Sequence, residues 1–226
     1  MITDTTYVAR HLHLLGEWDA ALAVLDPDAD PLLRAEIAVD QWFFRLEDHE
    51  EAERAVAVLD PASPAAQLLT GRLAYSRLLF RRDPRADDRA VAEACYRAAA
   101  GSADELQRGW AEYYWAVLLD NIDKDEDGAL ARYATALEIA TRLGDGFFES
   151  YIIRHVAHHR DPAEHVRMLR RSLHLRAALG ARPQTLAAQA ELAYTLSEDD
   201  PERAELIEAY RPGARELRIA WLLSED

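Results

Sequence analysis

The chain has 226 residues, 50% of them hydrophobic, and carries a formal net charge of −15 at pH 7. This charge argues against nucleic acid as a partner, because nucleic-acid binding needs a basic surface that releases counterions. No stretch approaches the roughly 18 consecutive apolar residues of a membrane span, and the N-terminus lacks the basic and apolar segments of a signal peptide. Because the single cysteine cannot form an internal disulfide, we expect a cytoplasmic protein with no membrane partner.

The predicted elements are helices that follow one another in pairs. No stretch alternates apolar and polar residues as a strand does, so we expect an all-α fold that forms a single domain over residues 1–226. Proline and glycine interrupt the helical pattern between the pairs. In chain order, the predicted pairs span residues 5–27, 31–61, 65–100, 105–143, 147–179 and 183–210.

Three further interruptions affect the predicted architecture. A charged loop over 81–88 lengthens the third pair, and an acidic linker over 120–127 separates the helices of the fourth pair. Pro212 and Gly213 interrupt the chain before a last helix, which we place at 213–223. We expect this last helix to cap the apolar end of the stack.

A common pattern marks the second helix of each pair. A turn or an acidic residue comes first, and a small residue follows at a position crowded by neighbouring helices. These positions recur at intervals of roughly 31 to 40 residues, and neighbouring pairs must stack because one pair cannot bury its own apolar face. The small residues are Ala21, Ala52, Ala92, Ala129 and Ala204, with His165 in place of a small residue in the fifth pair.

Other residues recur in the last three pairs. They are Trp115, Ala116, Leu119, Ala129, Tyr133 and Ala136 in the fourth pair, Ile152, Ile153, Val156, Leu169 and Ser172 in the fifth, and Leu192, Ala193, Leu196 and Ala204 in the sixth. Together with Asp26-Pro27 and Asp60-Pro61, this pattern resembles the tetratricopeptide repeat, a unit of two helices with a period of 34 residues. The resemblance covers about residues 5–210. It implies a right-handed superhelical solenoid of about six antiparallel helix pairs with a C-terminal capping helix.

The resemblance also implies a concave groove lined by the first helix of each pair. If Ile152 and Val156 are packed, then Tyr151, Arg154 and His158 face this groove, because they lie at i, i+3 and i+7 of one helix. Aromatic residues and arginine dominate the binding energy of many interfaces. With the same register in the fourth and sixth pairs, the predicted binding residues are Tyr113, Tyr114, Asp120, Tyr151, Arg154, His158, Glu191 and Tyr194.

Residues 154–182 are basic in an otherwise acidic chain. This segment holds seven arginines and five histidines against one aspartate and one glutamate. Arginine presents a planar fork of donors, so one interpretation is a site for a carboxylate, a phosphate or an acidic peptide. The other interpretation is a solvated helix face that pairs with acidic neighbouring repeats.

Catalysis and metal binding are the other chemistries that these residues could support. As an enzyme, the protein would use Asp120, Tyr151, Arg154, His158 and Glu191 as acid, base and anion stabiliser, although no motif of a known catalytic class accompanies them. The histidines at 155 and 159 have the i, i+4 spacing of zinc ligands, but the glutamate of a zinc-protease helix is missing between them. We therefore assign no metal and no cofactor.

The sequence predicts a binding protein in preference to an enzyme. We expect an adaptor or scaffold, monomeric or homodimeric, that holds an anionic or aromatic-containing protein or peptide in the groove of the fourth to sixth pairs. The alternative is an enzyme or accessory protein of a bacterial biosynthetic pathway that binds a small molecule there. An adaptor needs an open groove, whereas an enzyme needs a closed pocket with converging polar groups.

Overall fold

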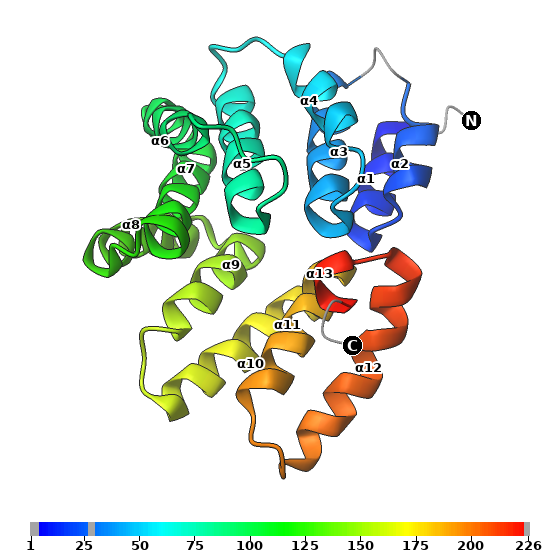
Figure 1. The fold of residues 1–226 in the computed structure, drawn as a ribbon, viewed down its shortest axis with the longest axis vertical. Coiled ribbons are helices and arrows are strands. Elements are labelled where there is room, and N and C mark those ends of the chain that lie inside the picture. The colour runs from blue at the N-terminus through cyan, green and yellow to red at the C-terminus, as the bar shows by residue number, and fades with distance from the viewer. Residues whose placement is uncertain (1–4, 27–29, 224–226) are drawn as a thin grey trace.

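The computed structural model describes residues 5–26 and 30–223, and all regular structure in these residues is helical. Thirteen α-helices lie in this part of the chain and pack largely as sequential pairs, so the predicted all-α class is confirmed (Figure 1). The helices are α1 (Thr5–Leu15), α2 (Trp18–Val24), α3 (Pro31–Arg45), α4 (His49–Ala57), α5 (Pro64–Phe80), α6 (Asp88–Ala99), α7 (Glu105–Leu118), α8 (Glu126–Leu143), α9 (Gly146–Ala157), α10 (Pro162–Ala178), α11 (Arg182–Thr195), α12 (Pro201–Leu217) and α13 (Ala220–Leu223), with a π-helical turn η1 (Leu119–Asp123) after α7. Pro27, which was expected to close the first pair, lies outside the described residues.

Several helices begin at a capping residue followed by proline. Asp161 accepts hydrogen bonds from the backbone N–H groups of Ala163 and Glu164, both at 3.1 Å, and so satisfies donors that the first helical turn leaves open. Pro162 suits the first helical position, because its fixed φ is already helical and its missing N–H is not needed there. The same arrangement begins α3, α5 and α12.

The small residues of the repeat pattern are buried with one exception. Ala21, Ala52, Ala92 and Ala129 have no exposed surface, which agrees with the crowded positions predicted for them. Ala204 is exposed, so its predicted position is wrong. The buried stripe of α12 comes from Tyr210 and the residues that follow it, and Ala204 lies off that stripe.

The helix boundary predicted at Pro212 is also wrong. α12 continues through Pro212 to Leu217, so the predicted separate cap over 213–223 does not form. A proline inside a helix removes one hydrogen bond and costs about 3 kcal/mol. Here Pro212 is exposed, whereas the next residue, Gly213, is buried so closely that a Cβ there would lie 2.9 Å from Leu186 Cδ2. Burial of this face of α12 offsets the lost hydrogen bond.

The first and last helices pack against each other. One buried apolar cluster joins α1, α2 and α3 to α11 and α12, and the short α13 packs on α3 (Figure 1). Gly16, with φ +80°, lies in this contact, because a Cβ there would be 2.7 Å from both Leu217 Cδ1 and Pro183 Cγ. The helix pairs therefore close on themselves around a central space. The right-handed superhelical sense implied by the resemblance stays a prediction.

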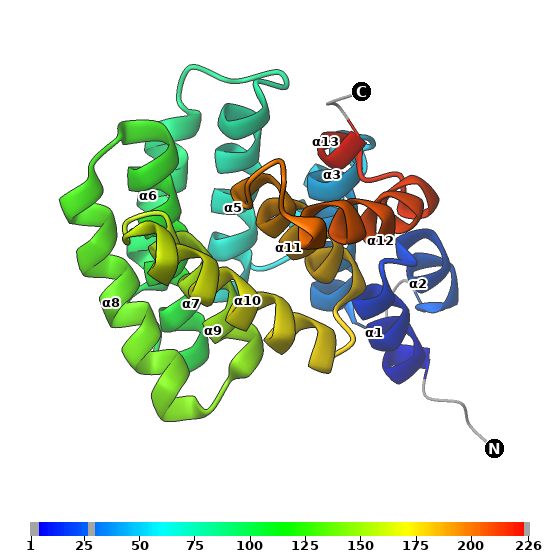
Figure 2. The same ribbon diagram turned by 90° about the horizontal axis from the view of Figure 1, so that it is seen from below.

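The first helices of the pairs face this central space. The space is lined mainly by α3, α5, α7, α9 and α11, while α8 lies on the outer side of α7 (Figure 2). This arrangement matches the helix order implied by the resemblance for a concave surface. Within the described residues, each helix is either too short or too polar to cross a lipid bilayer.

Candidate functional site

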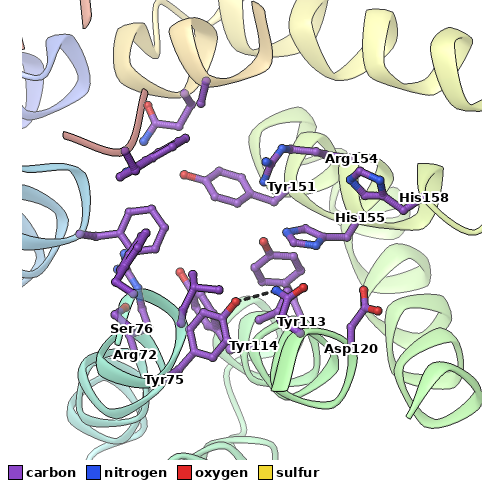
Figure 3. Close-up of a pocket in the computed structure, with 18 of the residues that line it drawn as sticks. Arg72, Tyr75, Ser76, Tyr113, Tyr114, Asp120, Tyr151, Arg154, His155 and His158 are labelled. Carbon is purple, nitrogen blue, oxygen red and sulfur yellow. Dashed lines mark hydrogen bonds between the residues drawn. The ribbon is translucent and has the colours of Figure 1, made fainter. Parts of the chain in front are cut away.

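The central space contains a pocket of about 700 Å³. Tyr113 and Tyr114 come from α7, Tyr151 and Arg154 come from α9, and His158 directly follows the end of α9 (Figure 3). The other walls come from α3, α5, η1, α10, α11 and α13. The volume lies within the range of small-molecule pockets, which is roughly 300–1,000 Å³.

Six of the eight predicted binding residues line this pocket, namely Tyr113, Tyr114, Asp120, Tyr151, Arg154 and His158. The other two do not. Glu191 lies behind Arg154 and His158 and bonds to both. Tyr194 lies near the end of α11, where its hydroxyl is 3.1 Å from that of Tyr210 in α12. The prediction for Tyr194 misplaced it because α11 faces the pocket only with its N-terminal half.

Arg154 already has an anionic partner. Its Nε donates to Glu191 Oε2, and His158 Nε2 lies 2.7 Å from Glu191 Oε1. Burial would raise the pKa of Glu191, but the charge of Arg154 and the bonds from His158 and Arg154 outweigh burial and lower it to about 2. The predicted ion pair between Arg154 and an external anion would therefore have to compete with Glu191.

Most other arginines of residues 154–182 also pair with acidic side chains. These ion pairs are Arg167–Glu164, Arg170–Glu202, Arg171–Glu149 and Arg182–Glu216. All four arginines are partly or largely exposed. Their exposure agrees with a solvated face, but Arg167–Glu164 and Arg171–Glu149 lie within the fifth pair, and Arg170–Glu202 joins the fifth pair to the sixth.

Arg176 is the exception in this segment. It is only 2% exposed and lines the pocket. Its Nε and Nη2 donate to Ser150 Oγ and O at 3.2 and 3.4 Å, and its Nη1 donates to the backbone oxygen of Gln184 at 3.1 Å. The guanidinium also lies over the ring of Tyr151, with its Cζ 4.8 Å from the ring centroid.

The partners of Arg176 are all neutral. No carboxylate of the described residues lies within ion-pair distance of it, and three bonds use three of its five N–H donors. Burial, and then the nearby charge of Arg154, lower the pKa of Arg176 to about 10, so it stays protonated at neutral pH. A buried cation without an anion is costly. The sequence signal for this residue is its place on the buried stripe of α10, at i+4 from Ser172.

Asp120 lines the pocket from a π-helical turn that follows α7. The predicted linker over 120–127 is partly helical, because α7 continues into the π-helical turn η1 before Asp125 caps α8. π-helical turns are rare and occur often at functional sites. In η1, Asn121 Nδ2 donates to the hydroxyl of Tyr75 at 2.6 Å (Figure 3).

The pKa values of two pocket histidines, His159 and His155, shift in opposite directions. Asp120 Oδ2 accepts from the hydroxyl of Tyr133 at 3.2 Å and lies 3.3 Å from His159 Nε2. Burial would lower the pKa of His159, but its contacts with Glu126 and Asp120 raise it. Burial, and then the charge of Arg154, hold the pKa of His155 well below its ordinary value, so His155 is neutral at physiological pH.

The sequence did not predict the opposite wall of the pocket. Arg72 of α5 pairs with Asp40 of α3, and its guanidinium Cζ lies 5.3 Å from the ring centroid of Tyr114. Trp221 of α13 stacks on Phe44, with ring centroids 5.9 Å apart. Trp221 reaches Phe44 because α13 packs on α3, whereas Arg72 and Asp40 meet between the packed helices α5 and α3.

Comparison with family models, curated proteins and solved structures gives no match to this chain. The site is therefore interpreted from its own geometry.

Proposed function

We propose that the protein binds a small organic anion with a planar aromatic part in the central pocket. The observation that supports this most directly is Arg176, a buried cation in the pocket wall without an anionic partner in the described residues. A ligand carboxylate would supply the missing charge and accept the N–H groups that Arg176 does not use within the protein. Arginine suits carboxylates because its planar fork can donate two parallel hydrogen bonds.

The walls favour a flat ligand. Tyr113, Tyr114, Tyr151, Phe44 and Trp221 line the same pocket as Arg176. Aromatic rings pack well in offset or edge-to-face contacts, which add about 0.5–1.5 kcal/mol per pair to the burial of apolar area. An aromatic carboxylate satisfies both the cation and these walls.

Because the helix pairs close on themselves around the central space, this space favours a small ligand over a long peptide. The sequence-based prediction of an adaptor needed an open groove, but α1, α2 and α3 pack on α11 and α12 and limit the length of any chain in the central space. Glu191 also already pairs with Arg154, the residue that was expected to hold a peptide anion. We therefore prefer the small-molecule alternative to the adaptor.

Catalysis on the bound anion is a second candidate. His155 is neutral and lies against Tyr113 and Tyr133, with ring centroids 5.6 and 5.8 Å away, and it lines the pocket. A neutral imidazole can accept a proton from a ligand. Conversion of a bound acid to a product of different mass, and loss of this conversion in His155→Gln, would identify an enzyme.

The binding proposal can be tested with matched acids and amides. We would titrate the protein by calorimetry with benzoate, phenylacetate and indole-3-acetate, and with the corresponding neutral amides. Each acid is expected to bind at least about tenfold more tightly than its amide, a difference of about 1.4 kcal/mol. Arg176→Met should remove this preference, while Arg171→Met, at an exposed position of the same helix, should keep it.

Two results would contradict the binding proposal. One is equal affinity for acids and amides in the wild type. The other is the absence of binding by all three acids at about 10 mM, where even a very weak specific site would be partly filled.

A further inference from the structure

A second pocket, of about 480 Å³, lies next to the first. The two pockets share Asp40, Arg72, Tyr114, Tyr151 and Gln184, so these five residues form the partition between them. The other walls of the second pocket come largely from α1, α3, α5 and α7. Its chemistry differs from that of the first pocket.

Glu36 is the carboxylate that distinguishes the second pocket. It lies on α3, lines the pocket, and has no ion pair or hydrogen bond from its carboxylate among the described residues. The nearby cations have other partners: Arg10 pairs with Asp30 at 3.0 Å, and Arg72 pairs with Asp40. Burial is the largest cause that raises the pKa of Glu36, and the charge of Asp40 adds to it, although the charges of His13, Arg10 and Arg72 act to lower it.

One residue of the partition, Gln184, carries a buried hydrogen-bond acceptor that no donor of the described residues satisfies. Gln184 is 7% exposed, and its Oε1 is buried with no hydrogen-bond donor in the described part of the chain. Buried polar atoms are satisfied in the great majority of cases, so an open acceptor in a pocket wall points to a ligand that donates. Glu36 and Gln184 come from different helices, and both line the same pocket.

One part of the remaining wall is aromatic. Trp110 stacks on Tyr114 with ring centroids 5.6 Å apart, and it meets Tyr151 edge to face at 5.2 Å. Phe147 lies 5.2 Å from Tyr151. Aromatic faces next to a carboxylate are the usual surroundings of an organic ammonium group, which gains from both charge and the ring quadrupole.

The other carboxylates of this pocket are already engaged. Asp40 bonds to His13 at 2.8 Å as well as to Arg72, and Asp104 caps α7 by accepting from the N–H of Gln107 at 3.0 Å. A bound metal ion would need several free oxygen ligands, and Glu36 is the carboxylate left to provide them. One free carboxylate, one open acceptor and an aromatic wall fit an ammonium group better than a metal ion.

We propose that the second pocket binds a primary ammonium group carried on an aromatic stem. Glu36 supplies the opposite charge, Gln184 Oε1 accepts one of the ammonium N–H bonds, and Trp110 contacts the stem. The charge and the stem contact of this site are separate from the anion site, because neither Glu36 nor Trp110 lines the first pocket, while Gln184 lines both.

The test compares three ligands that share a phenethyl stem and differ in the head group. We would measure the affinity of phenethylammonium, of 2-phenylethanol and of phenethyltrimethylammonium by calorimetry. The primary ammonium is expected to bind about tenfold more tightly than the neutral alcohol, because only it pairs with Glu36, and more tightly than the trimethylated ion, which has no N–H to donate.

Variants separate the two sites. Glu36→Gln should lower phenethylammonium affinity about tenfold, while Glu208→Gln, at an exposed position of α12, should leave it unchanged. Gln184→Leu, which retains the backbone oxygen used by Arg176, should remove the preference for the primary over the trimethylated ion. Arg176→Met should not alter amine affinity, and Glu36→Gln should not alter the affinity for benzoate.

Thermal unfolding would first establish that each variant is folded. An unchanged amine affinity in folded Glu36→Gln, or equal binding of the ammonium and the alcohol, would overturn the proposal. Failure of phenethylammonium to bind at about 10 mM would do the same. A wild-type protein that binds benzoate but not phenethylammonium would overturn this site and leave the anion site standing.

Discussion

The side chain of Arg45 in α3 donates a hydrogen bond of 3.1 Å to the backbone oxygen of Leu217 in α12, although 172 positions separate the two residues. Arg45 also pairs with Asp19 at 2.8 Å, and its guanidinium Cζ lies 5.1 Å from the centroid of the Trp18 ring. At 6% exposure it is a buried arginine that joins the two ends of the fold. This contact is one of those that hold α12 against the N-terminal helices.

Arg45→Met is expected to destabilise the protein by about 2 kcal/mol, because it leaves the oxygen of Leu217 without this charged donor and loosens the contact between the chain ends. Urea unfolding would measure the change. Arg54→Met is the control, since Arg54 forms only exposed ion pairs with Glu50 and Glu51 and should cost less than about 1 kcal/mol. Equal effects of the two substitutions would show that the chain ends contribute little to stability.

Gly16→Ala should be more costly than Gly144→Ala. Both glycines have positive φ, +80° and +65°, so both substitutions impose backbone strain of about 1–2 kcal/mol. Only at Gly16 would the added Cβ meet other atoms, Leu217 Cδ1 and Pro183 Cγ at 2.7 Å, whereas nothing lies within 4 Å of a Cβ at Gly144. The difference between the two unfolding free energies therefore measures the packing of the chain ends, and no difference would contradict this packing.

Arg77 and Arg176 test whether a buried arginine serves stability or binding. Arg77 pairs with the buried Asp88, so Arg77→Met should cost about 3–5 kcal/mol by leaving that carboxylate alone. Arg176 has neutral partners, so relief of its burial should offset most of the lost hydrogen bonds and keep the cost of Arg176→Met below about 1.5 kcal/mol. Chemical unfolding without ligand decides between these outcomes. A cost for Arg176 as large as that for Arg77 would indicate a structural role and weaken the proposed anion site.

The lowered pKa of Glu191 predicts how the free energy of unfolding changes at acid pH. Burial would raise its pKa, but Arg154 and His158 lower the folded-state pKa to about 2, below the ordinary value of 4.5. Since the folded-state pKa is the lower one, this stabilisation is fully present above pH 4.5 and is lost as the pH falls toward 2. The difference in unfolding free energy between the wild type and Glu191→Gln should therefore be largest above pH 4.5 and shrink as the pH falls. A difference that does not change with pH would contradict the ionised pairing.

Local parts of the fold and site could be predicted from the sequence. The Asp161-Pro162 pair predicts the start of α10, because capping acts within one helical turn. The spacing of Tyr151, Arg154 and His158 predicts one face of α9, and all three line the pocket. These predictions need only the period of a helix.

The rest depends on contacts that the sequence pattern does not indicate. Trp221 enters the pocket from α13 and stacks on Phe44 of α3, so its role follows from the packing of the chain ends. The π-helical turn at Asp120 follows from a change in hydrogen-bond register that no residue type marks. Pro212 predicts a break because its missing N–H is visible in the sequence, while the burial of Gly213 against Leu186 is not.

The meeting of Gly16 and Leu217 also fixes how many helix pairs the protein can have. In an open array each unit touches only its neighbours, so duplication or deletion of a unit changes the length and leaves the other contacts in place. Here the circumference is set, because removing one pair would pull α1 away from α12 and adding one would push them apart. The copy number of the repeat is thus a structural constant of this chain, and homologous proteins with an extra pair would require a different junction between their ends.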